Sequence, residues 1–91
     1  MIEIYTRSNC NWCFAAKRLL MLSGLDYTEY VVDRDPAALE RFEALAPAAT
    51  VPRIYTSGRL LGGYDDLKKL DDEGELVAVA VGAARPSPTI D

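Results

Sequence analysis

The hydrophobic and polar positions of the first 24 residues predict a strand, a loop and a helix. Apolar and polar residues alternate over residues 2–5, which is typical of a short strand. Residues 6–9 are polar and form a predicted loop. A helix follows over residues 10–22, because this segment is rich in Ala, Leu, Lys and Arg. Gly24 is a natural end for that helix.

A second strand and a second helix follow. Residues 27–32 are rich in β-branched and aromatic side chains, which predicts a strand. Asp35 is a predicted N-cap, and Pro36 suits the first helical position. Pro47 ends the helix. The apolar residues of this helix recur at a spacing of three and predict its buried face: Leu39, Phe42 and Leu45.

The second half of the chain changes to short strands. Residues 51–56 and 59–61 predict two strands joined by a two-residue turn at Ser57-Gly58. A third helix starts at residue 65 or 66 and runs to about residue 73. Strand, helix, strand, helix, hairpin and helix together predict an α/β fold, a mixed sheet with helices on its faces.

The end of the chain is ambiguous by pattern. Val77, Val79 and Val81 alternate with alanine, which fits either a strand or a buried helix. Residues 83–91 show no apolar periodicity, so we expect a mobile tail there. The folded domain is therefore predicted over residues 1–82.

Length and composition indicate one small domain. The chain has 91 residues, and 49% of them are hydrophobic, which is enough for a single core. Its longest apolar run, residues 76–81, is too short for a membrane span. The chain opens directly on a strand, so we expect no secretory signal before the fold. Two cysteines are too few for a secreted disulfide scaffold, and a cytoplasmic location is expected.

The absence of histidine excludes several kinds of site. A chain with no His has no Cys-His protease pair, no Ser-His-Asp triad and no histidine metal site. Two cysteines supply only half of a zinc site, so we expect no metal. The net charge of −4 argues against general binding to nucleic acid.

Both cysteines lie in one motif, Cys10-Asn11-Trp12-Cys13, at the predicted start of the first helix. A loop this short gains little stability from a disulfide, so the pair is interpreted as redox-active rather than structural. Free N–H groups and the positive end of the helix dipole favour a thiolate at Cys10.

Three motifs in this order resemble the glutaredoxins, small oxidoreductases of the thioredoxin fold that use glutathione. The resemblance covers residues 2–76 and rests on residues 5–13, on Thr50-Val51-Pro52 and on residues 62–67. It implies a thioredoxin fold, with a four-stranded mixed sheet flanked by three or more helices.

The resemblance also implies the activity. Cys10 is expected to be the nucleophile and Cys13 the resolving thiol, reducing protein disulfides and glutathione mixed disulfides. Glutathione is then a cosubstrate, and no bound cofactor is needed. The expected partners are glutathione and disulfide-containing or glutathionylated proteins, with neither nucleic acid nor membrane.

A glutathione site is implied as well. Pro52 is expected to be cis, which turns the Val51 backbone toward the ligand. Asp65, mainly through its backbone, and the Asp66 side chain are the expected partners of the γ-glutamyl carboxylate and ammonium. Arg53 is a weaker candidate for a positive charge on the same face, and Tyr5 is interpreted equally well as a groove or a sheet residue. The full predicted set is Arg7, Trp12, Thr50, Val51, Pro52, Gly63, Tyr64, Asp65 and Asp66.

The chain departs from the family inside the redox motif. Most dithiol members have proline and an aromatic residue between the cysteines, and this chain has Asn11-Trp12. Some relatives without that proline carry a [2Fe–2S] cluster, so the alternative is a homodimer that bridges a cluster through Cys10 and glutathione. A thioredoxin-type protein recharged by a reductase is a further alternative, but residues 62–66 favour glutathione. Trp12 would crowd a second subunit, so a monomeric thiol enzyme is expected.

Overall fold

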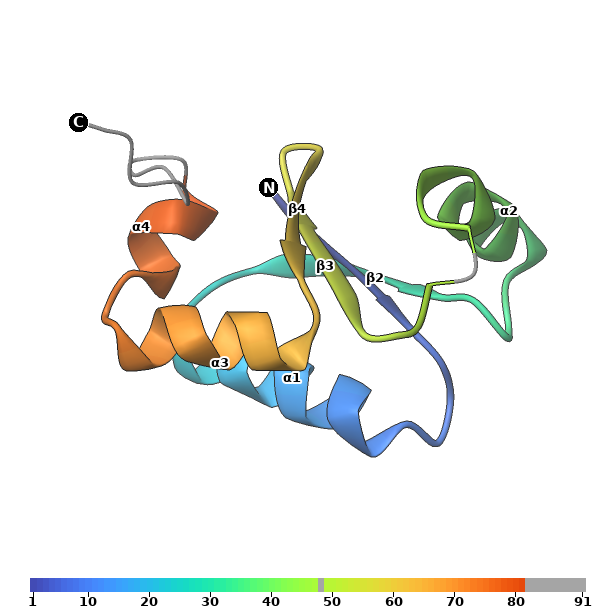
Figure 1. The fold of residues 1–91 in the computed structure, drawn as a ribbon. Helices are drawn as coiled ribbons and strands as arrows, with labels where there is room; N and C mark the ends of the chain where they lie inside the picture. The colour runs from blue at the N-terminus through green and yellow to red at the C-terminus, as the bar shows by residue number, and fades with distance from the viewer. Residues whose placement is uncertain (48, 82–91) are drawn as a thin grey trace.

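The computed structural model describes residues 1–47 and 49–81 and contains four strands and four helices among them (Figure 1). The first seven elements begin and end within a few residues of the segments that the sequence pattern predicts. In chain order the elements are β1 (Ile2–Thr6), α1 (Asn11–Leu22), β2 (Tyr27–Val31), α2 (Pro36–Leu45), β3 (Arg53–Thr56), β4 (Arg59–Gly62), α3 (Tyr64–Asp72) and α4 (Leu76–Ala80).

The strands form one mixed sheet in the order β2-β1-β3-β4. β1 pairs with β2 in parallel and with β3 antiparallel, and Ile4 lies opposite both Glu29 and Ile54. The parallel pair requires a crossover, which α1 provides. The Cys10 motif therefore lies where β1 leaves the sheet and α1 begins. The predicted four-stranded mixed sheet with helices on it is confirmed.

Helices cover both faces of the sheet. Residues of α1, α3 and α4 pack with Ile2, Ile4 and Ile54 on one face. On the other face, Phe42 of α2 packs with Tyr5 and its aromatic neighbours. Tyr5 is fully buried in that layer, so it is a sheet residue and not part of a ligand groove.

The predicted apolar face of the second helix was right at Phe42 and wrong at its other two positions. Leu39 and Leu45 are 36% and 51% exposed, and the buried positions are Ala38, Phe42 and Ala46. These three positions are four residues apart, so they form one stripe along the helix. Phe42 and the small Ala46 pack with Tyr5 and Tyr55 of the sheet.

The ends of several elements differ from the expectation. Cys10 is the N-cap of α1 rather than its first residue, and β3 begins at Arg53, because Pro52 has no N–H to donate to a ladder. α3 begins at Tyr64, with Gly63 as N-cap. The ambiguous segment of alternating valines forms the short helix α4, in which Leu76 and Val79 are buried.

The hairpin turn was predicted correctly. Ser57 and Gly58 both have positive φ, which is the backbone that a two-residue turn between twisted strands requires. The expected tail, residues 83–91, lies outside the described residues. Among the described helices, none is long and apolar enough to cross a membrane.

Candidate active site

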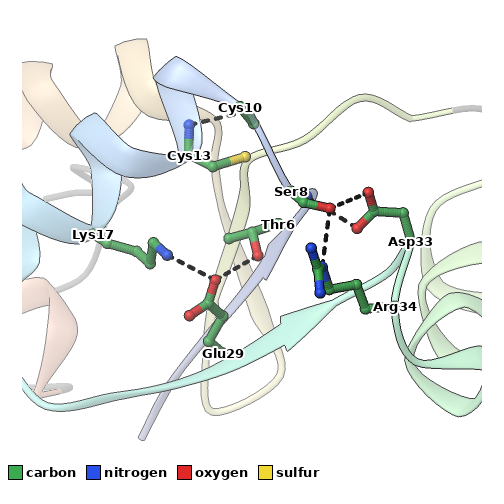
Figure 2. Close-up of polar contacts among 8 residues, drawn as sticks. All are labelled: Thr6, Ser8, Cys10, Cys13, Lys17, Glu29, Asp33 and Arg34. Carbon is green, nitrogen blue, oxygen red and sulfur yellow. Dashed lines mark hydrogen bonds and ion pairs between the residues drawn. The ribbon is translucent and has the colours of Figure 1, made fainter.

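Cys10 lies at the N-terminus of α1 and is partly exposed. Its backbone is extended, and its Sγ accepts a hydrogen bond from the Cys13 N–H over 3.1 Å (Figure 2). The thiol sulfur thus takes the place of the side-chain oxygen that normally caps a helix. The free N–H groups of the first turn and the positive end of the helix dipole therefore point toward this sulfur.

Cys13 lies one turn further along α1 in a different environment. Its side chain belongs to the buried core and is 2% exposed. Burial and the hydrogen bond with Cys10 raise the pKa of the Cys13 thiol above its ordinary value, to about 12. Both thiols are free in this structure. The pair therefore consists of one partly exposed sulfur at the helix start and one buried sulfur that stays protonated at neutral pH.

The loop before Cys10 is anchored to the loop after β2. The Ser8 N–H donates to Asp33 Oδ1 over 3.0 Å, the Ser8 hydroxyl donates to Asp33 Oδ2, and Arg34 Nε donates to the Ser8 hydroxyl over 3.3 Å (Figure 2). These Ser8 hydrogen bonds lower the pKa of the Asp33 carboxyl. Asn9 has φ of 58°, a left-handed conformation that asparagine tolerates better than most residues. The loop backbone that precedes Cys10 is thus held by hydrogen bonds to the loop after β2.

An ion pair lies below the thiols. Lys17 Nζ of α1 lies 2.9 Å from Glu29 Oε2 of β2, and the Thr6 hydroxyl donates to the same oxygen over 2.6 Å (Figure 2). Partial burial by itself raises the pKa of Glu29, but the hydrogen bonds from Thr6 and Lys17 outweigh it and lower the pKa. The contact joins the helix of the redox pair to the parallel strands.

A groove of about 470 Å³ opens next to the start of α1. Three chain segments converge on it: the start of α1, the loop before β3 and the start of α3. The Val51–Pro52 peptide in that loop is cis, as expected. The residues that line the groove are Trp12, Thr50, Val51, Pro52, Arg53, Gly63, Tyr64, Asp65 and Asp66.

The start of α3 presents both backbone N–H groups and carboxylates to this groove. The Gly63 N–H donates to Asp66 Oδ2 over 3.0 Å, so Asp66 caps its own helix. Gly62 has φ of 119°, and a Cβ at that position would overlap the Asp66 carboxylate. Only glycine leaves room for the carboxylate where it lies. Free N–H groups at a helix start suit a ligand carboxylate, and a nearby aspartate suits an ammonium group.

Two aromatic rings form one wall of the groove. The rings of Trp12 and Tyr64 lie 5.3 Å apart between centroids at an angle of 37°. Trp12 is nevertheless 61% exposed. The pair therefore connects the first turns of α1 and α3 and still offers an aromatic face to a ligand.

Eight of the nine residues predicted for glutathione line this one groove, although they come from three distant segments of the chain. The ninth, Arg7, lines a second groove with Cys10 and Cys13. Arg53 was only a weak candidate, yet it lines the first groove, and its Nε is buried without a hydrogen-bond partner among the described residues.

Comparison with known protein families shows to which family the chain belongs. The family model described as Glutaredoxin matches residues 2–61. The chain belongs to the glutaredoxin family. A Glutaredoxin 3 of Escherichia coli strain K12 is 37% identical over 75 residues, which are 82% of this chain and 90% of that protein. A glutaredoxin of Pseudomonas aeruginosa is 36% identical over 78 residues, 86% of this chain and 93% of its own length.

Solved structures of the family have the same fold. A Brucella melitensis glutaredoxin superposes with a TM-score of 0.76 at 31% identity and covers 92% of this chain and 91% of its own. A buckwheat glutaredoxin–glutathione complex has a TM-score of 0.76 at 21% identity, with coverage of 89% and 76%. The predicted thioredoxin fold is confirmed, and the family identifies the chain as a thiol oxidoreductase.

Sequence reasoning missed the residues behind and beside the thiols. Phe14 and Lys17 follow Cys10 at helical spacing. They therefore lie on the same side of α1 as Cys10. Glu29 and Arg34 reach this region only because β2 pairs with β1 in parallel. No sequence motif marks these two residues.

Proposed function

We propose that this glutaredoxin is a glutathione-dependent thiol–disulfide oxidoreductase in which Cys10 is the nucleophile and Cys13 the resolving thiol. The observation that carries the proposal is the contrast between the two sulfurs. Cys10 is accessible and accepts a helix N–H, whereas Cys13 is buried and its pKa is raised to about 12. The accessible sulfur is ready to attack, and the buried sulfur stays protonated until a disulfide forms beside it.

With a glutathione mixed disulfide, only Cys10 is required. The Cys10 thiolate attacks the glutathione sulfur, the original S–S bond breaks, and the target leaves as a thiolate that takes up a proton. A second glutathione then attacks the Cys10–glutathione disulfide. It releases glutathione disulfide and restores the Cys10 thiolate.

With a protein disulfide, both cysteines are required. Cys10 first forms a mixed disulfide with one target sulfur, and the other target sulfur leaves. Cys13 then loses its proton and attacks Cys10 Sγ, which releases the reduced target and leaves the Cys10–Cys13 disulfide. Two glutathione molecules reduce that disulfide and become oxidised to glutathione disulfide.

The first groove is the proposed glutathione site. The N–H groups at the start of α3 bind the γ-glutamyl carboxylate, and the Asp66 side chain binds its ammonium group. The Val51 backbone pairs with the peptide part of the ligand, and Trp12 and Tyr64 flank it. Arg7, next to Cys10, is the proposed partner of the glycine carboxylate. The glutathione complex of the buckwheat relative supports this class of ligand.

Turnover of a small glutathione mixed disulfide tests the proposal directly. The purified protein, assayed with the glutathione mixed disulfide of 2-mercaptoethanol, glutathione and glutathione reductase, should show NADPH consumption that depends on glutathione. We propose a monomer that works in the cytoplasm, without a metal. Absence of turnover by the fully reduced protein would reject the proposed function.

A further inference from the structure

A second groove, of about 460 Å³, contains both thiols and lies between α1 and β2. It is distinct from the first groove, because the two share no lining residue. In Figure 2 the region extends from Cys10 down to the ion pair of Lys17 and Glu29 and across to Arg34. The lining residues are Arg7, Ser8, Asn9, Cys10, Asn11, Cys13, Phe14, Lys17, Glu29, Val31 and Arg34.

This groove continues along α1 into a smaller hollow. The hollow, of about 200 Å³, shares Phe14 and Lys17 with the groove and adds Arg18, Met21 and Tyr27. Phe14 and Met21 are 66% and 61% exposed. They lie seven residues apart on one side of α1, with Arg18 between them. A large apolar contact surface therefore leads away from the nucleophile, and no described residue covers it.

The charge of this surface is opposite to that of the whole chain. The chain carries a net charge of −4, yet Arg7, Lys17, Arg18 and Arg34 line the two hollows. Asp33 lies beside Ser8 just outside the lining, and the single carboxylate of the lining itself is that of Glu29. That carboxylate is already bound by Lys17 and Thr6. Charges beyond about 10 Å are screened at moderate salt, so the local cations decide what binds here.

Two of the cationic side chains that line the groove are held by other residues of the protein. Lys17 is held by Glu29, and Arg34 is held by the Ser8 hydroxyl, which Asp33 also binds. A preformed surface loses less conformational entropy when a partner binds. Its extended shape, with exposed apolar side chains next to arginines, suits a polypeptide, which is longer than glutathione and carries apolar side chains as well.

We propose that this second groove binds the polypeptide on the target side of the disulfide, specifically a segment that places an apolar residue and acidic residues next to its cysteine. The apolar residue lies on Phe14 and Met21, and the acidic residues lie near Arg18 and Arg34. In the proposed function glutathione occupies the first groove and reaches Arg7 with its glycine carboxylate, so the two substrates share only the region around Arg7 and Cys10. The proposal rests on the proposed function, because it assigns the second substrate of the same reaction.

The reaction balances with both grooves in use. A target disulfide held in the second groove receives the Cys10 thiolate on one sulfur, and its other sulfur leaves as a thiolate and takes up a proton. Cys13 then attacks Cys10 Sγ, and the target departs with both of its sulfurs reduced. Two glutathione molecules return the enzyme to the dithiol and leave as glutathione disulfide.

Two synthetic peptides and one small substrate test the assignment. Each peptide carries an intramolecular disulfide and a leucine next to one cysteine, with flanking glutamates in the first peptide and flanking lysines in the second. The small substrate is the glutathione mixed disulfide of 2-mercaptoethanol, which has no polypeptide for the second groove. The wild-type protein should reduce the acidic peptide about tenfold more efficiently in kcat/KM, and this preference should shrink as salt is raised.

Arg18→Glu is the decisive variant, and Arg59→Glu is its matched control. Arg18 and Arg59 are both exposed, and Arg59 lies opposite Thr56 in the hairpin, at the end of the sheet away from the thiols. Arg18→Glu should remove the preference for the acidic peptide and leave turnover of the small substrate within about twofold. Arg59→Glu should change neither activity, although it changes the net charge equally.

Several results would overturn the proposal. The proposal would fail if the wild type reduced the two peptides at equal rates. It would also fail if Arg18→Glu reduced the acidic peptide as fast as the wild type does. A parallel loss on the small substrate would place Arg18 in the general reaction instead. A wild-type dimer in sedimentation that Arg18→Glu dissociates would assign the groove to a second copy of the chain. Failure of the wild type on the small substrate would instead reject the proposed function.

Discussion

Cys10 and Cys13 lie one helical turn apart, and the position of each along α1 sets its chemistry. The first turn of a helix has free N–H groups, so Cys10 Sγ finds a donor in the Cys13 N–H. One turn further, the side chain points into the core, where a charged sulfur is costly. The asymmetry that a resolving mechanism needs thus follows from the start of one helix.

Serine substitutions should separate the two roles. Cys10→Ser should abolish activity on every disulfide, because the attacking thiolate is gone. Cys13→Ser should retain turnover of a glutathione mixed disulfide and lose reduction of an intramolecular protein disulfide. Rates on the two substrates, measured for both variants with glutathione and glutathione reductase, check this. An equal loss in the two variants would contradict the assignment.

Asp66 combines two tasks in one side chain, and its substitution should affect them by different amounts. Asp66→Ala should weaken glutathione use by about 1–3 kcal/mol, the range for a hydrogen bond to a charged group. It should lower the free energy of unfolding by about 1 kcal/mol, through loss of the Gly63 contact. Glutathione titration and urea unfolding give the two numbers.

Asp35→Ala is the matched control for that measurement. Asp35 caps α2 through the Ala37 N–H and lies outside the lining of the first groove, whereas its neighbour Arg34 lines the second groove. The Asp35→Ala substitution should lower the free energy of unfolding by a similar amount and leave glutathione use unchanged. If Asp66→Ala behaves like Asp35→Ala in both assays, the ammonium group binds elsewhere.

At the scale of elements, the connection from β4 to α3 decides where the Asp66 carboxylate lies. β4 ends at Gly62 and α3 starts two residues later, so the chain turns sharply with φ of 119° at Gly62. That turn brings the first carboxylates of α3 against the backbone of the strand end. The groove therefore depends on a glycine that itself contacts no ligand in the proposal.

Gly62→Ala should impair both stability and glutathione use. The new Cβ would be held in a backbone region that L-residues avoid and would overlap the Asp66 carboxylate. We expect a loss of about 1–3 kcal/mol in the free energy of unfolding and a weaker glutathione dependence. Urea unfolding and a glutathione titration measure the two effects.

Gly74→Ala isolates the backbone part of that cost. Gly74 has φ of 73°, and a Cβ there meets no atom within 4 Å. This variant should lose stability through the backbone alone and keep its glutathione dependence. Comparable glutathione defects in the two variants would show that displacement of Asp66 is not the cause.

At the scale of the whole molecule, the buried thiol links stability to pH. An unfolded cysteine ionises near pH 8.5, whereas folding raises the pKa of Cys13 to about 12. Between these values the unfolded chain has released a proton that the folded chain retains. The unfolded state binds fewer protons, so the free energy of unfolding falls as pH rises through this window.

Urea unfolding of the reduced protein from pH 8 to pH 10.5 measures that slope. The wild type should lose stability more steeply than Cys13→Ala, by at most about 1.4 kcal/mol per pH unit, the limit for one titrating group. Burial also raises the pKa of Tyr5, but Tyr5 is present in both proteins, so its contribution cancels in the difference. Parallel curves for the two proteins would contradict the raised pKa of Cys13.

The sequence by itself determined the Cys10–Cys13 pair, the order of the first seven elements and most of the residues of the first groove. These features are local: a helix start, a turn with two positive φ residues and a proline before a strand each depend on a few neighbouring residues. The resemblance of the motifs to a known family then predicted that distant segments form one site. Eight of the nine residues predicted in this way line one groove. Their roles in binding glutathione stay predictions.

Only the tertiary structure decided which faces are buried and what surrounds the thiols. The apolar spacing of α2 indicated Leu39 and Leu45, but Phe42 and Ala46 are the residues of this segment that pack with the aromatic layer of the sheet. Likewise, the parallel pairing of β1 with β2 places Glu29 next to Lys17. Pairing between strands is non-local, so no short sequence pattern specifies the second groove.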